Sequence, residues 1–367
     1  MSEGGYPFHR IRNDAEFVRK TLIVMGLVLL ALLLWKLADV LLLAFGAILV
    51  ALILRASADL LVRYARVPER WSLWVASIII FTIFLGLIAV FGTQMRAQFS
   101  NVVERLPFVL DNFSKNLGFG PISDDLDKIV NSMSSGGLAT RIAGIGGAVI
   151  SGFTDFLLVA IAGIYIAASP SLYKKGFIKL FPKHQHERVE SSLDASGEAL
   201  RLWLMSQLIA MGCVAVLSTL AFWFIGLPSP YALGMIAGLA DFIPFLGPIL
   251  GAVPAVLFAF SISGETALWT VLAVLAIQQI EGNVIFPLVA RSMVSIPPAL
   301  ALFAILVASI LFGTMGLIFG FPLAVVTYVL VKKLYVREAL GEETSVPGEK
   351  EAQKKAEQKK AQEEGSA

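Results

Sequence analysis

A short polar cluster inside an apolar stretch offers the clearest candidates for binding chemistry. The stretch runs over residues 266–290, and Pro287 follows the cluster. An ionised acid at the centre of a membrane helix costs about 2.5 to 3.5 kcal/mol. We therefore expect the cluster's acid to face protein or water, or to carry a proton. The cluster consists of Gln278, Gln279, Glu281 and Asn283.

Asp241 is the second acid that lies deep within an apolar segment, three residues before Pro244. Carboxylates and amides in a membrane suit a polar solute or a coupling ion. We predict a substrate or ion site built from Asp241 and the polar cluster. The alternative is a hydrogen-bonded clamp between helices. The substitution Glu281→Gln distinguishes the two hypotheses. It should abolish gradient-driven transport if Glu281 is a coupling acid, whereas a clamp should accept the amide.

Two apolar segments, 231–262 and 299–331, are interrupted by glycine and proline. As one helix, the first would be about 48 Å long. Paired interruptions of this kind point to a transporter site, because unwound backbone at membrane depth is tolerated only where it lines a cavity or is buried. The alternative is that the breaks only permit close packing. The breaks expected to line the site are Pro244, Gly247, Pro248, Gly251, Pro254, Pro287, Gly313, Gly316 and Pro322. Leucine at Gly247 or Gly316 is then expected to cut transport and spare insertion.

Composition places these segments in a membrane. Hydrophobic residues make up 57% of the 367-residue chain and charged residues 15%, against about 25% charged in soluble domains. Apolar runs of the length that spans a bilayer recur along the chain. We predict an all-α polytopic membrane protein with eight membrane segments, six of them full spans and two re-entrant hairpins. The spans are the first three within 21–93, a fourth at 147–168 and the remainder within a transport core at 202–333.

Basic residues flank several spans and predict their orientation by the positive-inside rule. The N-terminus (1–20), an amphipathic helix at 169–201 and a disordered charged tail at 338–367 are expected in the cytoplasm. The first span is expected to be an uncleaved anchor. An amphipathic connection at 94–146 is expected outside. A cytoplasmic tail requires the interrupted segments to be two spans or two hairpins. Hairpins are favoured, and they make Arg291→Cys reactive from the cytoplasm and Glu265→Cys from outside.

The motifs at the breaks and the polar cluster resemble those of the autoinducer-2 exporter family. The resemblance rests on residues 244–248 (Pro-Phe-Leu-Gly-Pro), on 278–283 with Pro287, and on 313–316 with Pro322. It implies an inner-membrane permease that exports a small polar solute such as autoinducer-2. It also implies a homo-oligomer, for which we take a pentamer as the working number. One departure is the loop at 292–297, which lacks the glycines usual in the family.

We predict a secondary transporter driven by a proton or sodium gradient. A sodium(lithium)/proton antiporter, a passive channel and a membrane scaffold remain as alternatives. No enzyme motif, cofactor site, metal site or nucleic-acid partner is predicted. Cys213 suits a small buried hydrophobe, and His184 with His186 suits a solvated loop.

Overall fold

The computed structural model describes residues 8–83, 85–86, 154–289, 296–342, 344 and 346. These residues form helices, with no strand among them, which confirms the all-α prediction. Five described helices are long and apolar enough to cross a membrane, and a sixth is obtained if one bent pair counts as a single span. The count of eight membrane segments stays a prediction. The predicted connection at 94–146, the residues beyond 346 and Arg291 lie outside the described part of the chain.

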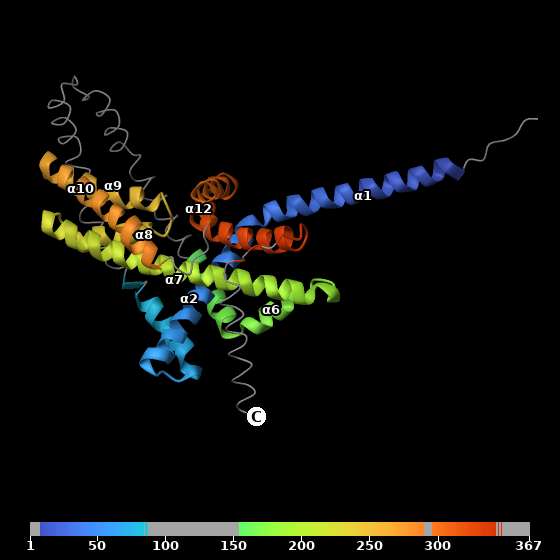
Figure 1. Ribbon diagram of the computed structural model, residues 1–367, viewed down its shortest axis with the longest axis horizontal. Helices are drawn as coiled ribbons and strands as arrows, with labels where there is room; N and C mark the ends of the chain where they lie inside the picture. Colours follow the sequence, from blue (N-terminus) through green and yellow to red (C-terminus); the bar gives the residue numbers. More distant parts are fainter. Residues whose placement is uncertain are drawn as a thin grey trace, which may run out of the picture.

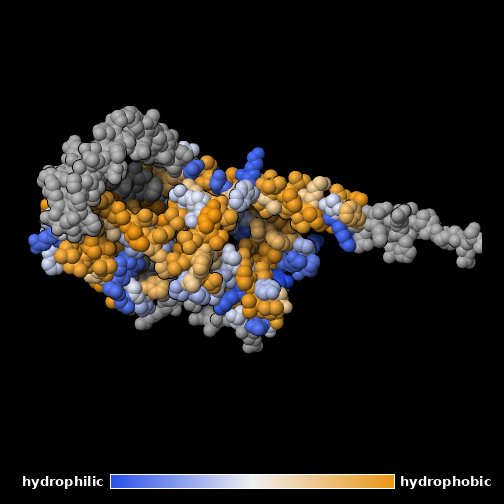
Figure 2. Space-filling model, turned by 90° about the horizontal axis from the view of Figure 1, so that it is seen from above, coloured by the Kyte–Doolittle hydropathy of each residue, from blue (hydrophilic) through white to orange (hydrophobic). Residues whose placement is uncertain are grey.

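The first two helices lie in the region where the first spans are predicted. Helix α1 (Phe8–Lys36) projects away from the other described elements (Figure 1), and its side chains from Phe17 to Lys36 are all exposed. Helix α2 (Ala38–Ala65) buries Leu42, Leu49 and Leu54, of which Leu49 and Leu54 belong to different hydrophobic clusters. The next residues, 69–83, are helical and belong to the predicted third span. Orange hydrophobic residues cover much of the face seen in Figure 2, as expected for a protein whose solvent is largely lipid.

The fourth apolar helix, Thr154–Ala168, bends by 88° into helix α6 (Pro170–Ile178). Proline at this bend has no N–H to continue the first helix and disfavours helical backbone in the residue before it. A short 3₁₀ turn (Lys183–Gln185) follows Pro182 and leads into helix α7 (His186–Ile225). The structure therefore divides the predicted helix at 169–201 into two helices.

Helix α7 is the element around which the others pack. Its 40 residues correspond to a length of about 60 Å. It contacts α2 and α6, and also α8, α10 and α12, which are defined below. The helix ends at Gly226, which has the left-handed φ of 83° that glycine favours.

The first interrupted segment folds back on itself as a helical hairpin. Helices α8 (Pro230–Ala240) and α9 (Gly247–Phe260) are joined by a turn in which Phe245 has a φ of 69°. In a straight helix Ala237 and Gly251 would be about 21 Å apart. Here a Cβ added to Gly251 would lie 2.7 Å from the Ala237 Cα, and one added to Gly247 would lie 2.3 Å from the Ala240 carbonyl oxygen.

The second interrupted segment, helix α12 (Pro298–Leu330), repeats this design. Gly313 has a φ of 60° and a ψ of −140°, which breaks the helix into two halves. A Cβ added to Gly316 would lie 1.9 Å from the Ala308 carbonyl oxygen, and one added to Gly320 would lie 3.0 Å from the Ile305 Cα. The two halves therefore pack against each other across a surface of small residues. Both interrupted segments are hairpins; their depth in a membrane stays a prediction.

The remaining elements connect and extend these hairpins. Helix α10 (Gly264–Ile280) continues through a π-helical turn (Glu281–Ile285) into helix α11 (Phe286–Val289). A second π-helical segment (Val331–Arg337) extends α12. Beyond it, Glu338 pairs with Arg188 of α7, and Val346 is only 5% exposed. The start of the predicted charged tail is thus packed against the body of the protein.

Candidate functional site

The site is built around Asp241, which caps the C-terminus of α8 at the turn of the first hairpin. The residue is only 2% exposed, and its Oδ2 has no hydrogen-bond donor among the described residues. Carbonyl groups at a helix C-terminus present partial negative charge. A buried carboxylate in this position is therefore poorly stabilised by the described protein groups and suits a bound proton or cation.

Glu281 faces Asp241 from the end of α10. The two carboxyl groups interact electrostatically, and Gln278 donates a hydrogen bond from Nε2 to Glu281 Oε2 over 3.3 Å. Two carboxylates that share a site do not both ionise easily. One proton held between them, or one small cation bound by both, would satisfy the pair. The structure thus brings together three of the five predicted binding residues.

The other two predicted residues lie elsewhere on the same helix. Asn283 donates from Nδ2 to the backbone oxygen and to Oε1 of Gln279, each over 3.0 Å, and both side chains are exposed. These two side chains are hydrogen-bonded to each other, on a face of the helix away from Asp241. The wide polar cluster seen in the sequence is therefore two features, an acid-facing pair and an exposed amide pair.

Gln207 of α7 is a residue of the site that the spacing of the sequence does not identify. Its Nε2 donates a 2.7 Å hydrogen bond to the backbone oxygen of Asp241. The bond ties the turn of the first hairpin to the centre of α7. The sequence signal is the stretch from Trp203 to Gln207, which is similar to the polar entry to the fifth span in the autoinducer-2 exporter family.

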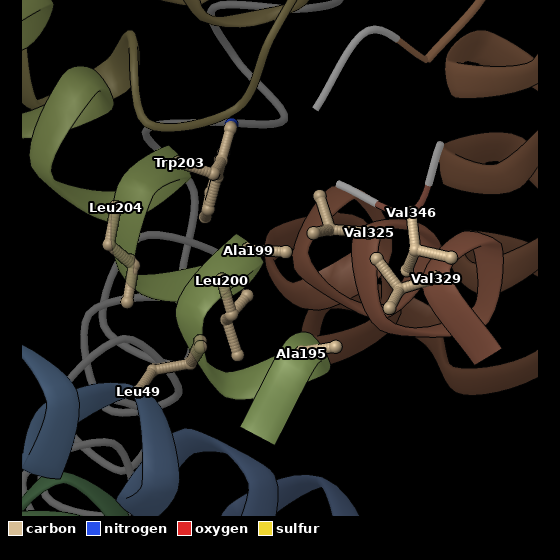
Figure 3. Packing of buried hydrophobic residues seen from close by; sticks show 9 residues of the cluster. All are labelled: Leu49, Ala195, Ala199, Leu200, Trp203, Leu204, Val325, Val329 and Val346. Atoms are coloured by element: carbon tan, nitrogen blue, oxygen red, sulfur yellow. The ribbon is translucent and has the colours of Figure 1, made fainter. Parts of the chain in front are cut away.

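Trp203 joins the two hairpins at the same level of α7. Its ring centroid lies 5.9 Å from that of Phe242 in the first hairpin and 5.2 Å from that of Phe321 in the second. In Figure 3 Ala199 of α7 points toward Val325 of α12, and Trp203 lies further along α7 in the same cluster. A movement of either hairpin would therefore change the packing around the Trp203 ring.

A small pocket lies beside the acid pair, where α7, α8, α9 and α10 meet. Ser218 and Gln278 supply its polar side chains. Because Ala237 and Asp241 are four residues apart, as are Ile277 and Glu281, the pocket lies about one helical turn from the carboxyl groups. The other lining residues are Val214, Phe222, Ala237, Pro248, Ala252, Val274 and Ile277.

The predicted glycine and proline breaks divide into several roles. Pro248 lines the pocket, whereas Gly247, Gly251 and Gly316 face the opposite arm of their own hairpin. Pro254 and Pro322 lie within helices, and Pro287 is exposed. Pro244 lies in the turn of the first hairpin, and Gly313 forms the break of the second. The glycines at the hairpin contacts thus have a packing role, and their lining of a solute site stays a prediction.

Comparison with known proteins adds the family context. A family model described as "AI-2E family transporter" matches residues 22–335. From Bacillus subtilis (strain 168), "Putative transport protein YrrI" is 30% identical over 210 residues, which are 56% of this chain and 59% of the relative. "Putative transport protein YueF" from the same organism is 27% identical over 281 residues, 71% of this chain and 75% of the relative.

A third relative, "Putative transport protein" of Thermotoga maritima, is 26% identical over 204 residues, 55% of this chain and 62% of the relative. The chain therefore spans less than two thirds of the length of YrrI and of the Thermotoga protein.

Proposed function

This chain belongs to the AI-2E transporter family, and we propose that it is a secondary transporter that exports a small polar solute, driven by a proton or sodium gradient. The observation that carries the proposal is that buried Asp241, at the turn of a helical hairpin, faces half-buried Glu281. A carboxyl pair of this kind suits a cation or a proton. Among the described residues, no hydrogen-bond partner is found for Asp241 Oδ2.

The same pair supports a simple coupling scheme. Binding of a proton or sodium ion neutralises the site, and its release leaves two carboxylates that repel each other. Glu281 is on α10 and Asp241 is on the first hairpin, so repulsion acts between these two elements. Gln207 and Trp203 connect the hairpin turn to α7, so a change at the acids is passed to the centre of the bundle.

The proposal includes a solute of the autoinducer-2 type and a setting in the inner membrane of a bacterium. Both termini would be cytoplasmic, and the transporter would act as a homo-oligomer without a cofactor or catalytic step. A sodium(lithium)/proton antiporter is the second candidate. The small pocket favours this candidate. Its polar side chains are those of Ser218 and Gln278, so the acid pair itself would bind the transported ions and form the whole transport site.

The test is transport by the purified full chain in proteoliposomes under imposed proton or sodium gradients. We expect Glu281→Gln and Asp241→Asn each to reduce gradient-driven transport of autoinducer-2 by at least about tenfold, the loss of roughly 1.4 kcal/mol of coupling. Exchange of solute without a gradient should survive, because an amide keeps the hydrogen bonds of Glu281 but cannot titrate.

Glu265→Gln is the matched control, since Glu265 is an exposed acid in the first turn of the same helix. Ion exchange without autoinducer-2 movement would favour the antiporter, and solute flux that ignores both gradients would favour a channel. Normal driven transport by Glu281→Gln and Asp241→Asn would contradict the coupling role.

A further inference from the structure

Helix α6 is attached to the rest of the protein along one side. Lys174 forms ion pairs with Glu190 and Asp194 of α7, both at 2.8 Å. Ile178, four residues further and on the same face, is buried. These contacts hold α6 against the N-terminal part of α7.

The bend before α6 sets its direction relative to a membrane. Thr154–Ala168 is apolar and bent by 88° from Pro170–Ile178. Helices that cross a bilayer are tilted by about 20° on average. If Thr154–Ala168 crosses the membrane, α6 must then run close to the membrane plane.

The exposed sides of α6 differ in chemistry. Tyr173 and Phe177 are four residues apart and share one side, and each is 47% exposed. Lys175 and Lys179 are each two residues from Phe177, which is about 200° around a helix, so they lie on the opposite side, where Leu172 is also 67% exposed. Leu180, in the turn that follows, is 78% exposed. An aromatic side opposite a lysine side is the pattern of a helix that lies in the membrane interface.

We infer that α6 and the turn after it bind the anionic phospholipids of the leaflet in which the chain is embedded. The apolar side continues a surface that already belongs to the membrane, because Leu157, Leu158, Ile161 and Tyr165 of the preceding helix are exposed as well. The lysines supply the opposite charge to acidic headgroups and reach them with long flexible side chains. The occupant is thus the lipid surface itself.

The consequence for the protein is an anchored α7. Lys174 ties α6 to the same helix that carries Trp203 and Gln207 at the acid site. A lipid-bound α6 therefore fixes the cytoplasmic end of the element around which both hairpins pack. The inference does not depend on the identity of the solute or of the coupling ion.

The experiment measures how fast a cysteine at Leu180 reacts with a membrane-impermeant maleimide. The full-length Cys213→Ala chain carrying Leu180→Cys is placed in nanodiscs of phosphatidylcholine alone or with about 30 mol% phosphatidylglycerol. The second composition has a roughly physiological share of acidic lipid. We expect slower reaction in the acidic discs. In the acidic discs, Lys175→Gln with Lys179→Gln should raise the reaction rate by up to about 25-fold, taking about fivefold for each lysine near an anionic surface.

Two controls and a second reporter keep the outcome decisive. Lys354→Gln with Lys355→Gln removes the same charge from the tail and should leave the rate unchanged. Glu187→Cys, exposed in the first turn of α7, should react alike in both lipids. Tyr173→Cys serves as a second reporter if Leu180→Cys fails to fold.

Equal rates in neutral and acidic discs at both reporters would overturn the inference. Protection in neutral discs by inorganic phosphate at fixed ionic strength would overturn it too, because the site would then recognise a free phosphate group. Neither result depends on transport, so a failure here is distinct from a failure of the Glu281 experiment.

Discussion

The two hairpins of this protein are built alike but equipped differently. In each, a pair of glycines four residues apart packs against the arm that precedes it, at Gly247 with Gly251 and at Gly316 with Gly320. The first hairpin carries Asp241 at its turn, whereas the second turns at Gly313, where an added Cβ would meet nothing within 4 Å. Close packing of small residues is thus a shared means of folding back, and an acid at the turn is a separate addition.

The turns also differ in what holds them. The first is tied to α7 by Gln207 and is followed by the pocket wall at Pro248. The second leads into an arm whose Val325 and Val329 pack with Val346 from the start of the tail. We infer that the first hairpin carries the binding chemistry and call it the chemical half of the pair. The second hairpin supplies packing contacts, and we call it the mechanical half. The predictions below test this division, in order of decreasing effect.

The largest effect is expected where the two hairpins are the same. Gly316→Ala and Gly247→Ala should each destabilise the protein by about 3 kcal/mol, because a methyl group would overlap a backbone carbonyl. The added Cβ would lie 1.9 Å from the Ala308 carbonyl oxygen at Gly316 and 2.3 Å from the Ala240 carbonyl oxygen at Gly247. Unfolding can be followed by the reaction of Cys213, the single cysteine of the chain, with a fluorogenic maleimide.

Gly197→Ala is the control for this pair, because Gly197 lies within α7 with nothing within 4 Å of its added Cβ. This variant should be neutral or slightly stabilising. Stability equal to the control at both hairpin positions would show that the arms do not pack as described. The structure also revises the expectation for leucine at these positions, since lost packing now accompanies lost transport.

How far the sequence predicts this arrangement depends on the range of the interaction. Both breaks follow from glycine and proline spacing within one segment, the positive-inside rule favours hairpins over full spans at these breaks, and the deep acids follow from their cost in hydrocarbon. The contact that Gln207 makes could not be predicted, because its partner is a backbone oxygen 34 residues away that the hairpin turn presents.

The separation of Gln279 and Asn283 from Glu281 was likewise hidden from the sequence. It depends on how α10 packs against its neighbours and on the π-helical turn that begins at Glu281, which changes the helical periodicity at the cluster. Spacing gave the width of the cluster, but tertiary packing decides which of its members meet the second acid.

The next effect should be confined to the first hairpin. Gln207→Leu removes the donor to the Asp241 carbonyl oxygen and should destabilise the protein by about 2 kcal/mol, the usual cost of an unpaired buried polar group. Gln279→Leu is the control, since Gln279 is exposed and its partner Asn283 is exposed as well. A loss no larger than that of the control in thermal denaturation would remove Gln207 from the description of the turn.

A smaller effect should distinguish the second turn. Gly313→Ala should cost between about 1 and 2 kcal/mol through backbone conformation alone, because space is available but a φ of 60° with a ψ of −140° is a conformation that only glycine adopts without strain. Asparagine at Gly313 should be no better, since the ψ of −140° lies outside the left-handed helical region that asparagine tolerates. At Gly226, with a φ of 83° and a ψ of 27°, asparagine should be better tolerated than alanine. Rescue of Gly313 by asparagine would contradict the described turn.

The smallest effect is expected at the tail. Val346 is 5% exposed and packs with Val325 and Val329, so Val346→Ala should cost about 1 kcal/mol through the loss of buried methyl groups. Val331→Ala is the control, because Val331 is 48% exposed just beyond the same arm. The contact joins the tail to the second hairpin, so Val346→Ala should leave the reactivity of a cysteine placed at Ser218, in the pocket of the first hairpin, unchanged. A change at Ser218→Cys would mean that the tail acts on both hairpins, and the division between a chemical and a mechanical half would fail.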